Sequence, residues 1–243
     1  MQLRKKEIRS ILIIAFIAAF IFSFNEWGID KFNLLVGIQN FLFALVFCLI
    51  IYTTHAFSQK FTAKFFDHEI EFTLLTIRKK IKEVRKTIMV PIGPAITLLI
   101  TLLTNGKLIF LLLNSFEMKS NKTHRLGRKW INIKDFEEAQ IALAGPLSEI
   151  LLLILFKILS PLSLIFSKGM FIASTIAIFN MLPLPKVDGS KIFFGSRPLY
   201  VASLVFIIIF IILIFQLSIL QTLILAMILT IIVGTIYLYK LNN

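Results

Sequence analysis

The sequence predicts an all-α polytopic membrane protein with about six transmembrane helices and a re-entrant or β-hairpin-like insertion near residues 89–113. Two observations support this fold class. Hydrophobic residues make up 58% of the 243 residues, and they fall in long blocks that contain few charges. A helix that crosses a bilayer needs about 20 mostly apolar residues, whereas a soluble core is built from amphipathic segments. We therefore expect residues 1–243 to form a single integral membrane domain.

The charged residues indicate how this domain is oriented. Lysines and arginines number 26 against 13 acidic residues, and they gather in short segments beside the hydrophobic blocks. This is the distribution that the positive-inside rule describes for cytoplasmic loops, and it argues against nucleic acid as the partner. We expect a multi-pass protein of the cell membrane with a cytoplasmic N-terminus, whose partners are the lipid bilayer and a membrane protein. The single cysteine, Cys48, excludes an internal disulfide framework.

The first half of the chain contains two long predicted helices. The first covers residues 10–24 and reads as a retained signal anchor, since no small-residue cleavage site follows it. The second begins at residue 34 and continues to about residue 66. The apolar stretch 89–104 is too short for two spans and contains two prolines and a glycine. Asn105-Gly106 then predicts a tight turn, and residues 108–113 a strand or short return.

The second half predicts the remaining helices. A basic loop over residues 119–134 precedes an apolar block at 136–159, and a second block follows at 162–182. The last block, residues 199–241, is long enough for two helices. We place the turn between them at residues 216–221, the one polar cluster in this stretch.

Three ionisable residues in or beside these blocks are candidates for function, since charge inside a membrane is energetically unfavourable. They are His55, Glu149 and Asp188. The topology places His55 and Asp188 on the same side, and imidazole and carboxylate are normal zinc ligands. Simpler explanations exist for each. A histidine near the interface can be a polar anchor, and Asp188-Gly189 is an ordinary turn signal. Glu149 can be a structural partner of a polar group across the bundle, with Gln59 and His55 as the two candidates.

Two segments of the chain resemble the site-2 protease family of intramembrane zinc metalloproteases. Residues 179–191, FNMLPLPKVDGSK, are similar to the family's FN-L-P-P-LDG signature, and their ending is most similar to an archaeal-like branch. Residues 141–149, IALAGPLSE, resemble its AGPL-x-N segment, with Glu149 in place of the asparagine. The resemblance covers about residues 34–198 and leaves 10–24 and 199–241 as extra helices. It implies Asp188 as a metal ligand and four substrate-binding or structural residues: Asn180, Gly145, Pro146 and Gly189.

The zinc-binding motif that the resemblance implies is degenerate. The family carries HExxH, in which the two histidines bind the metal and the glutamate activates water. Here His55 matches, but Ala56 replaces the glutamate and Gln59 replaces the second histidine. His55 and Asp188 alone would give zinc two protein ligands, where catalytic sites typically use three, and Gln59 is only a weak further candidate. A general base is also missing, unless Glu149 is a relocated acid or base.

The sequence therefore predicts a catalytically inactive homologue, a pseudoprotease, in which zinc binding is weak or lost. Such a protein would bind a transmembrane segment or a membrane partner without cleaving it. The alternative is an active intramembrane zinc metalloprotease with an altered metal site, acting on transmembrane substrates in regulated intramembrane proteolysis. A small transporter is a third class, for which the sequence offers no inverted repeat.

Overall fold

The computed structural model describes residues 3–28, 32–81, 86–119 and 134–242. Within these residues the chain forms eight helices and four short strands. The helices are α1 (Lys5–Ser23), α2 (Leu34–Phe65), α3 (Ile92–Leu103), α4 (Asp135–Leu159), α5 (Ile165–Met181), α6 (Asp188–Gly195), α7 (Arg197–Ile214) and α8 (Ile219–Asn242). The strands are β1 (Glu69–Leu74), β2 (Ile77–Ile81), β3 (Lys86–Val90) and β4 (Asn114–Lys119).

Six of the helices, α1, α2, α4, α5, α7 and α8, coincide with the apolar segments predicted from the sequence. Of the helices in the described residues, four are long and apolar enough to cross a membrane, namely α2, α4, α7 and α8. α5 has only 17 residues, and α1 begins with the charged residues Lys5, Lys6 and Glu7. Six transmembrane helices therefore remain a prediction, and length and composition support four of them.

The local sequence explains where two of the long helices begin. Asn33 precedes α2, and its side-chain oxygen accepts a hydrogen bond from the Leu35 N–H at 3.1 Å. Ser196 plays the same part for α7 by accepting from the Leu199 N–H at 3.4 Å. Pro198 lies in the first turn of α7, where its missing N–H needs no partner. Ser196 and Pro198 thus mark the boundary between the short helix α6 and α7.

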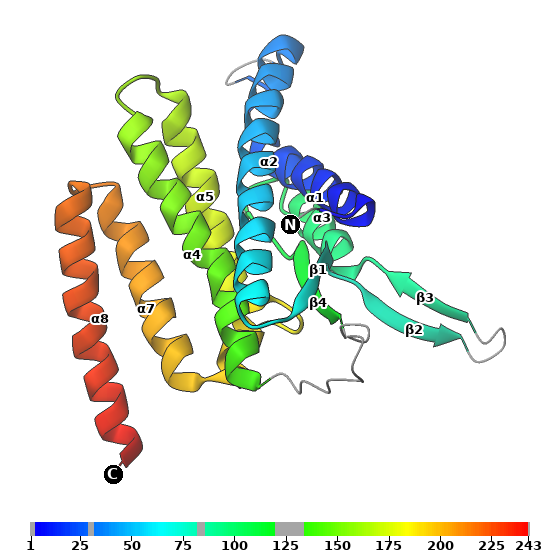
Figure 1. The fold of residues 1–243 in the computed structure, drawn as a ribbon. Helices are drawn as coiled ribbons and strands as arrows, with labels where there is room; N and C mark the ends of the chain where they lie inside the picture. Colours follow the sequence, from blue (N-terminus) through cyan, green and yellow to red (C-terminus); the bar gives the residue numbers. More distant parts are fainter. Residues whose placement is uncertain (1–2, 29–31, 82–85, 120–133, 243) are drawn as a thin grey trace.

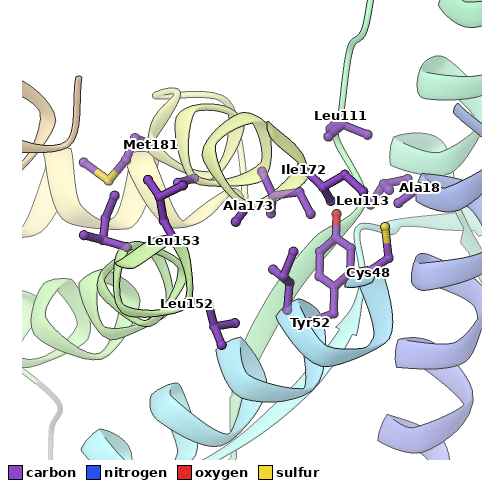
Figure 2. Close-up of a cluster of buried hydrophobic side chains, with 14 of the residues drawn as sticks. Ala18, Cys48, Tyr52, Leu111, Leu113, Leu152, Leu153, Ile172, Ala173 and Met181 are labelled. Carbon is purple, nitrogen blue, oxygen red and sulfur yellow. The ribbon is translucent and has the colours of Figure 1, made fainter. Parts of the chain in front are cut away.

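The centre of the fold is a layer of α2, α4 and α5, with α1 packed on one side and α7 on the other (Figure 1). Small side chains let the helices approach closely, as at the fully buried Ala15 and Ala18 of α1. Figure 2 shows the interior of this layer, where Tyr52 of α2 lies among side chains of α5 and of the extended segment before β4. The main contacts of α8 within the described residues are with α7. α8 is also the most exposed of the four long apolar helices.

The expectation of an all-α fold is wrong for the region between α2 and α4. Two antiparallel pairs of strands lie there, β1 with β4 and β2 with β3. The β2–β3 pair projects away from the helices (Figure 1) and includes the basic residues Arg78, Lys79 and Lys80. β1 and β4 are separated by α3 and by the β2–β3 pair, so their pairing depends on contacts that a local sequence pattern does not reveal.

The predicted insertion near residues 89–113 is a helix with an extended return rather than a β-hairpin. The helix is α3, and the turn after it lies at Asn105 and Gly106, as predicted, with φ angles of 51° and 69°. The chain then runs back without a regular strand until β4 begins at Asn114, so residues 108–113 form a short return, the second of the two predicted alternatives. The basic loop predicted at 119–134 lies almost entirely outside the described residues.

Candidate functional site

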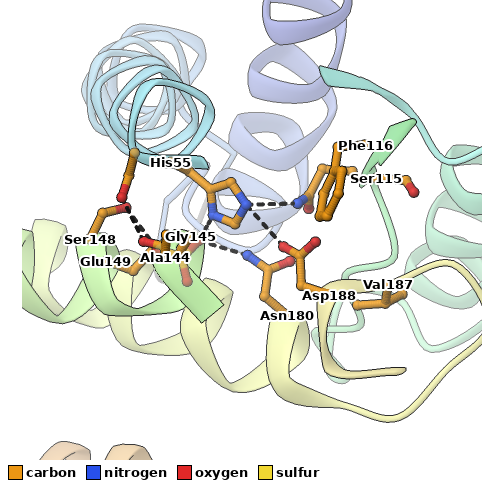
Figure 3. Close-up of polar contacts among 12 residues, drawn as sticks. His55, Ser115, Phe116, Ala144, Gly145, Ser148, Glu149, Asn180, Val187 and Asp188 are labelled. Carbon is orange, nitrogen blue, oxygen red and sulfur yellow. Dashed lines mark hydrogen bonds and ion pairs between the residues drawn. The ribbon is translucent and has the colours of Figure 1, made fainter. Parts of the chain in front are cut away.

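The side chain of His55 lies in a buried polar cluster that four helices and one strand build together (Figure 3). Nδ1 of its ring is 2.7 Å from Oε1 of Glu149 on α4, and Nε2 is 3.0 Å from Oδ2 of Asp188 on α6. Asn180 of α5 donates to the same Glu149 oxygen at 2.6 Å. Nδ2 of Asn114, the first residue of β4, lies 3.4 Å from Nε2. The structure therefore brings together four residues that the sequence singled out.

Two glycines allow this close packing. A Cβ atom on Gly145 would stand 2.3 Å from Cε1 and 2.4 Å from Nε2 of the His55 ring, so a side chain there would displace the imidazole. A Cβ atom on Gly189 would stand 2.3 Å from the carbonyl oxygen of Met181. Pro146 is buried within α4 beside Gly145. Gly145, Pro146 and Gly189 therefore contribute to the cluster through packing.

The contact between His55 and Asp188 requires a proton or a bound cation at the pair. Lone pairs on a ring nitrogen and a carboxylate oxygen would repel at 3.0 Å, so one of the two groups is protonated or both bind a cation. Nδ1 already faces Glu149, and a neutral imidazole has only one N–H. If protons alone hold the cluster, a second proton resides on the ring or on one carboxyl group.

Several polar atoms of the cluster have no hydrogen-bond partner among the described residues. They are Oε2 of Glu149 and both carboxylate oxygens of Asp188, whose approach to Nε2 is an ion pair without hydrogen-bond alignment. Both amide atoms of Gln59, a buried residue four positions after His55 on α2, also lack a partner. Buried polar groups are normally hydrogen-bonded, and an unpaired one is costly. The cluster is thus incompletely satisfied by protein atoms, and the orphan atoms of Glu149 and Asp188 lie on opposite sides of the His55 ring.

The donor set does not fit a catalytic zinc ion. Glu149 and Asp188 contact different ring nitrogens, which point away from each other, so the two carboxylates cannot join His55 Nε2 around one ion. Within the part of the chain that the structure describes, no group of three His, Cys, Asp or Glu side chains could hold a metal. One imidazole and one carboxylate remain at Nε2, where a catalytic zinc site typically has three strong ligands.

A third buried carboxylate, that of Glu7, lies at the start of α1. Oε2 of Glu7 accepts hydrogen bonds from the Arg4 N–H at 2.7 Å and from Nζ of Lys60, on α2, at 2.5 Å. Oε1 accepts from the backbone N–H of Phe72, on β1, at 3.1 Å. Phe72 in turn packs its ring edge-to-face against His55, with 5.8 Å between the ring centroids. Glu7 thus joins α1 to α2 and β1 directly behind the His55 cluster.

Lys191 on α6 is the charged residue that connects this region to β4. Its Nζ donates to the carbonyl oxygen of Phe116 at 2.6 Å and lies over the Phe116 ring. Burial lowers the pKa of Lys191 to about 8, although the nearby carboxylates of Asp188, Glu138 and Glu117 act in the opposite direction. The folded protein therefore holds the charged form of Lys191 less readily than water does.

Sequence reasoning missed four residues of this region: Asn114, Phe72, Glu7 and Lys191. Asn114 and Phe72 reach the cluster through the unforeseen β1–β4 pairing, so no local signal indicated them. Glu7 had a signal, because it is the one acid among the basic residues before the first apolar block. The sequence also left open whether Glu149 pairs with His55 or Gln59, and the structure places it on His55.

The chain was compared with known proteins. No protein-family model matches it, and neither a curated protein nor a solved structure does.

Proposed function

We propose that this chain is a site-2-protease-like integral membrane protein that lacks peptidase activity and binds a transmembrane segment or a membrane partner. The observation that supports this proposal is the His55 cluster. Both ring nitrogens of His55 face carboxylates of the chain itself, at 2.7 and 3.0 Å. Ala56 stands at the position where the resemblance implies the water-activating glutamate.

The chemistry of peptide hydrolysis supports the inactive assignment. A metalloprotease needs an ion with an open coordination position and a base that takes a proton from the bound water. Glu149, the candidate relocated base, has one oxygen already engaged by His55 and Asn180. His55, Glu149 and Asp188 are also completely buried, so a scissile peptide bond cannot reach them in this conformation.

One observation favours the alternative of an active metalloprotease with an altered site. Metal-bound histidines usually donate their second ring N–H to a carboxylate, and the Glu149–His55 pair has this arrangement. Asp188 at the other ring nitrogen would then be the second ligand. This reading requires a third strong ligand that the described residues do not supply, and we therefore place it second.

A cleavage assay tests the proposal. Purified protein and the His55→Ala variant are incubated with a panel of transmembrane peptides in nanodiscs, and products are detected by mass spectrometry. We expect no product that is absent from the His55→Ala reaction. Cleavage by the wild-type protein that disappears in His55→Ala would contradict the inactive assignment, because His55 would then be required for hydrolysis.

We also propose that the chain spans the cell membrane several times with its N-terminus in the cytoplasm. This orientation rests on the placement of lysine and arginine. It predicts that Arg197, an exposed residue at the start of α7, faces the cytoplasm. In a Cys48→Ala background, an Arg197→Cys variant should react with a membrane-impermeant maleimide only after the cells are opened. Labelling from outside intact cells would contradict the orientation.

A further inference from the structure

A cavity of about 510 Å³ lies between the first turn of α4 and α6. This volume is within the range of about 300–1,000 Å³ that small-molecule sites occupy. Its charged lining consists of Asp135 and Glu138 on α4, and of Lys186 and Lys191 from the segment before α6 and from α6. Gly195 lets α6 end close to α4, because a Cβ atom there would stand 2.3 Å from the carbonyl oxygen of Asp135. The packing of α6 on α4 therefore shapes the cavity.

The charged groups on the two walls of the cavity differ in their hydrogen bonds. Nζ of Lys191 donates to the carbonyl oxygen of Phe116, and Nζ of Lys186 to that of Thr76, both at 2.6 Å. Each ammonium group has further N–H groups after this one bond. Within the described part of the chain, the two carboxylates on α4 have neither a hydrogen bond nor an ion pair. The cavity thus offers unpaired acceptors on one wall and spare donors on the other.

The cavity lies where two long apolar helices begin. α4 begins at Asp135 and α7 at Arg197, and both starts lie at the same end of the molecule (Figure 1). Phe194, which also lines the cavity, is 81% exposed. Exposed aromatic rings are enriched at the level of the lipid headgroups. In a chain that spans the membrane along α4 and α7, the cavity is at the depth of the headgroups.

We propose that this cavity binds the headgroup of phosphatidylethanolamine, with its ammonium group at Asp135 and Glu138 and its phosphate at Lys186 and Lys191. The inference rests on the proposed function, since it requires a chain that spans the membrane. The N–H groups of a primary ammonium form charge-assisted hydrogen bonds with carboxylates, which are among the strong ones. The phosphate accepts from the remaining N–H groups of the two lysines. Each wall of the cavity then faces a group of opposite charge.

The charges of the cavity favour this zwitterion over other occupants. An anionic headgroup such as that of phosphatidylglycerol leaves the two carboxylates on α4 without a partner. Asp188 and Glu117 also lie near Lys191 and make the surroundings more negative, which disfavours a purely anionic occupant. Phosphatidylcholine carries the same charges, but its quaternary ammonium has no N–H group to donate. A basic protein segment would place like charges beside the two lysines.

Native mass spectrometry of the full-length protein tests this preference. The protein in detergent is incubated with equal amounts of phosphatidylethanolamine, phosphatidylcholine and phosphatidylglycerol that carry the same acyl chains. We expect about tenfold more bound phosphatidylethanolamine than either of the other two lipids. Equal binding of the three lipids, or no lipid adduct, would overturn the inference. Phosphatidylglycerol bound as well as phosphatidylethanolamine would also overturn it, because the phosphate alone would then be recognised.

Exchanging single carboxylates identifies the groups that hold the ammonium. Glu138→Gln should reduce the preference to less than about twofold. Glu137→Gln is the matched control, since it removes the same charge from the same turn of α4, but its carboxylate faces His68 at 3.4 Å. Acidic residues in a first turn also offset the helix dipole, and an effect of that kind would change both variants equally. Asp135→Asn, at an exposed position, replaces Glu138→Gln if that variant does not fold.

The inference is overturned if the cavity variant keeps the preference, or if Glu137→Gln loses it to the same extent. Its failure is distinguishable from failure of the proposed function. Peptide cleavage or stoichiometric zinc would contradict the inactive assignment, whichever lipid binds. Equal binding of the three lipids would contradict the headgroup site and leave the metal content and the labelling of Arg197→Cys unaffected.

Discussion

Phe72 contacts two buried carboxylate clusters, through its backbone N–H and through its ring, and the clusters differ in how completely their hydrogen bonds are satisfied. Both oxygens of Glu7 accept hydrogen bonds, from two backbone N–H groups and the ammonium group of Lys60. In the His55 cluster, one oxygen of Glu149 and both oxygens of Asp188 lack a hydrogen-bond partner among the described residues.

The difference in hydrogen bonding suggests different roles for the two clusters. A fully satisfied network stabilises a single arrangement, whereas buried polar atoms without partners cost free energy and are expected where a ligand or a chemical function requires them. Complete hydrogen bonding supports a scaffold role for the Glu7 cluster. The incomplete His55 cluster agrees with the proposal that it is the remnant of a site.

The largest expected effect is at Glu7. Glu7→Leu removes the acceptor of the Phe72 N–H and the carboxylate that Lys60 contacts, so we expect a loss of about 3–5 kcal/mol in the free energy of unfolding. Chemical denaturation in detergent measures this loss. Glu69→Leu is the matched control, because the Glu69–Arg4 pair is about half exposed and should contribute less than about 1 kcal/mol. Equal losses in the two variants would show that Glu7 has no scaffold role.

A smaller effect is expected at Gly145, which sharpens the description of the His55 cluster. Gly145→Ala places a methyl group against the His55 ring and should lower the stability by about 1–3 kcal/mol, because the ring has to move. Gly234→Ala on α8 is the matched control, since its added Cβ meets no atom within 4 Å. That variant should be neutral or up to about 1 kcal/mol more stable. Equal melting temperatures for both variants would contradict the close packing of His55.

Exchanging each glutamate for glutamine compares the two clusters directly. Glu149→Gln keeps an oxygen that can accept from Asn180 or His55, so we expect a loss of about 1 kcal/mol. Glu7→Gln should cost more, because Lys60 loses a carboxylate at 2.5 Å. The comparison of the two clusters fails if Glu149→Gln proves the more destabilising of the pair in the same denaturation assay.

A further expected effect is the pH dependence of stability from Lys191. Its pKa of about 8 in the folded protein lies below the ordinary value of 10.5, so the unfolded chain binds more protons between these values. The stability of the wild-type protein relative to Lys191→Met should therefore rise as the pH increases from about 8 to 10.5. Melting temperatures at the two ends of this range test the sign. A constant or falling difference would contradict the burial of the ammonium group.

The helices could be predicted from the sequence because a bilayer-sized apolar block is a local property. The six predicted blocks are all helices, and the polar residues after Ile214 mark the turn between α7 and α8. The strands could not be predicted in the same way. β1 pairs with a strand that follows α3, and the basic residues of β2 resemble a loop. Whether α1 and α5 cross the membrane depends on their depth in the bilayer, which local composition does not determine.

The part of the site that follows from the order and direction of the helices could be predicted from the sequence. The distribution of lysine and arginine placed His55 and Asp188 on one side, and the two side chains lie 3.0 Å apart. The contact of Glu149 with His55 was one of two alternatives, because Gln59 lies one turn further along the same helix. Asn114 could not be foreseen at all, since it enters the cluster through the β1–β4 pairing.

The metal content of the purified protein tests the central claim most directly. The proposal that zinc binding is weak or lost predicts that His55 and Asp188 form an ion pair with no metal ion bound to them. After purification in the presence of zinc and dialysis, we expect less than about a tenth of an equivalent of zinc per chain, unchanged in Asp188→Ala. About one equivalent that disappears in Asp188→Ala would contradict the inactive assignment and favour the metalloprotease.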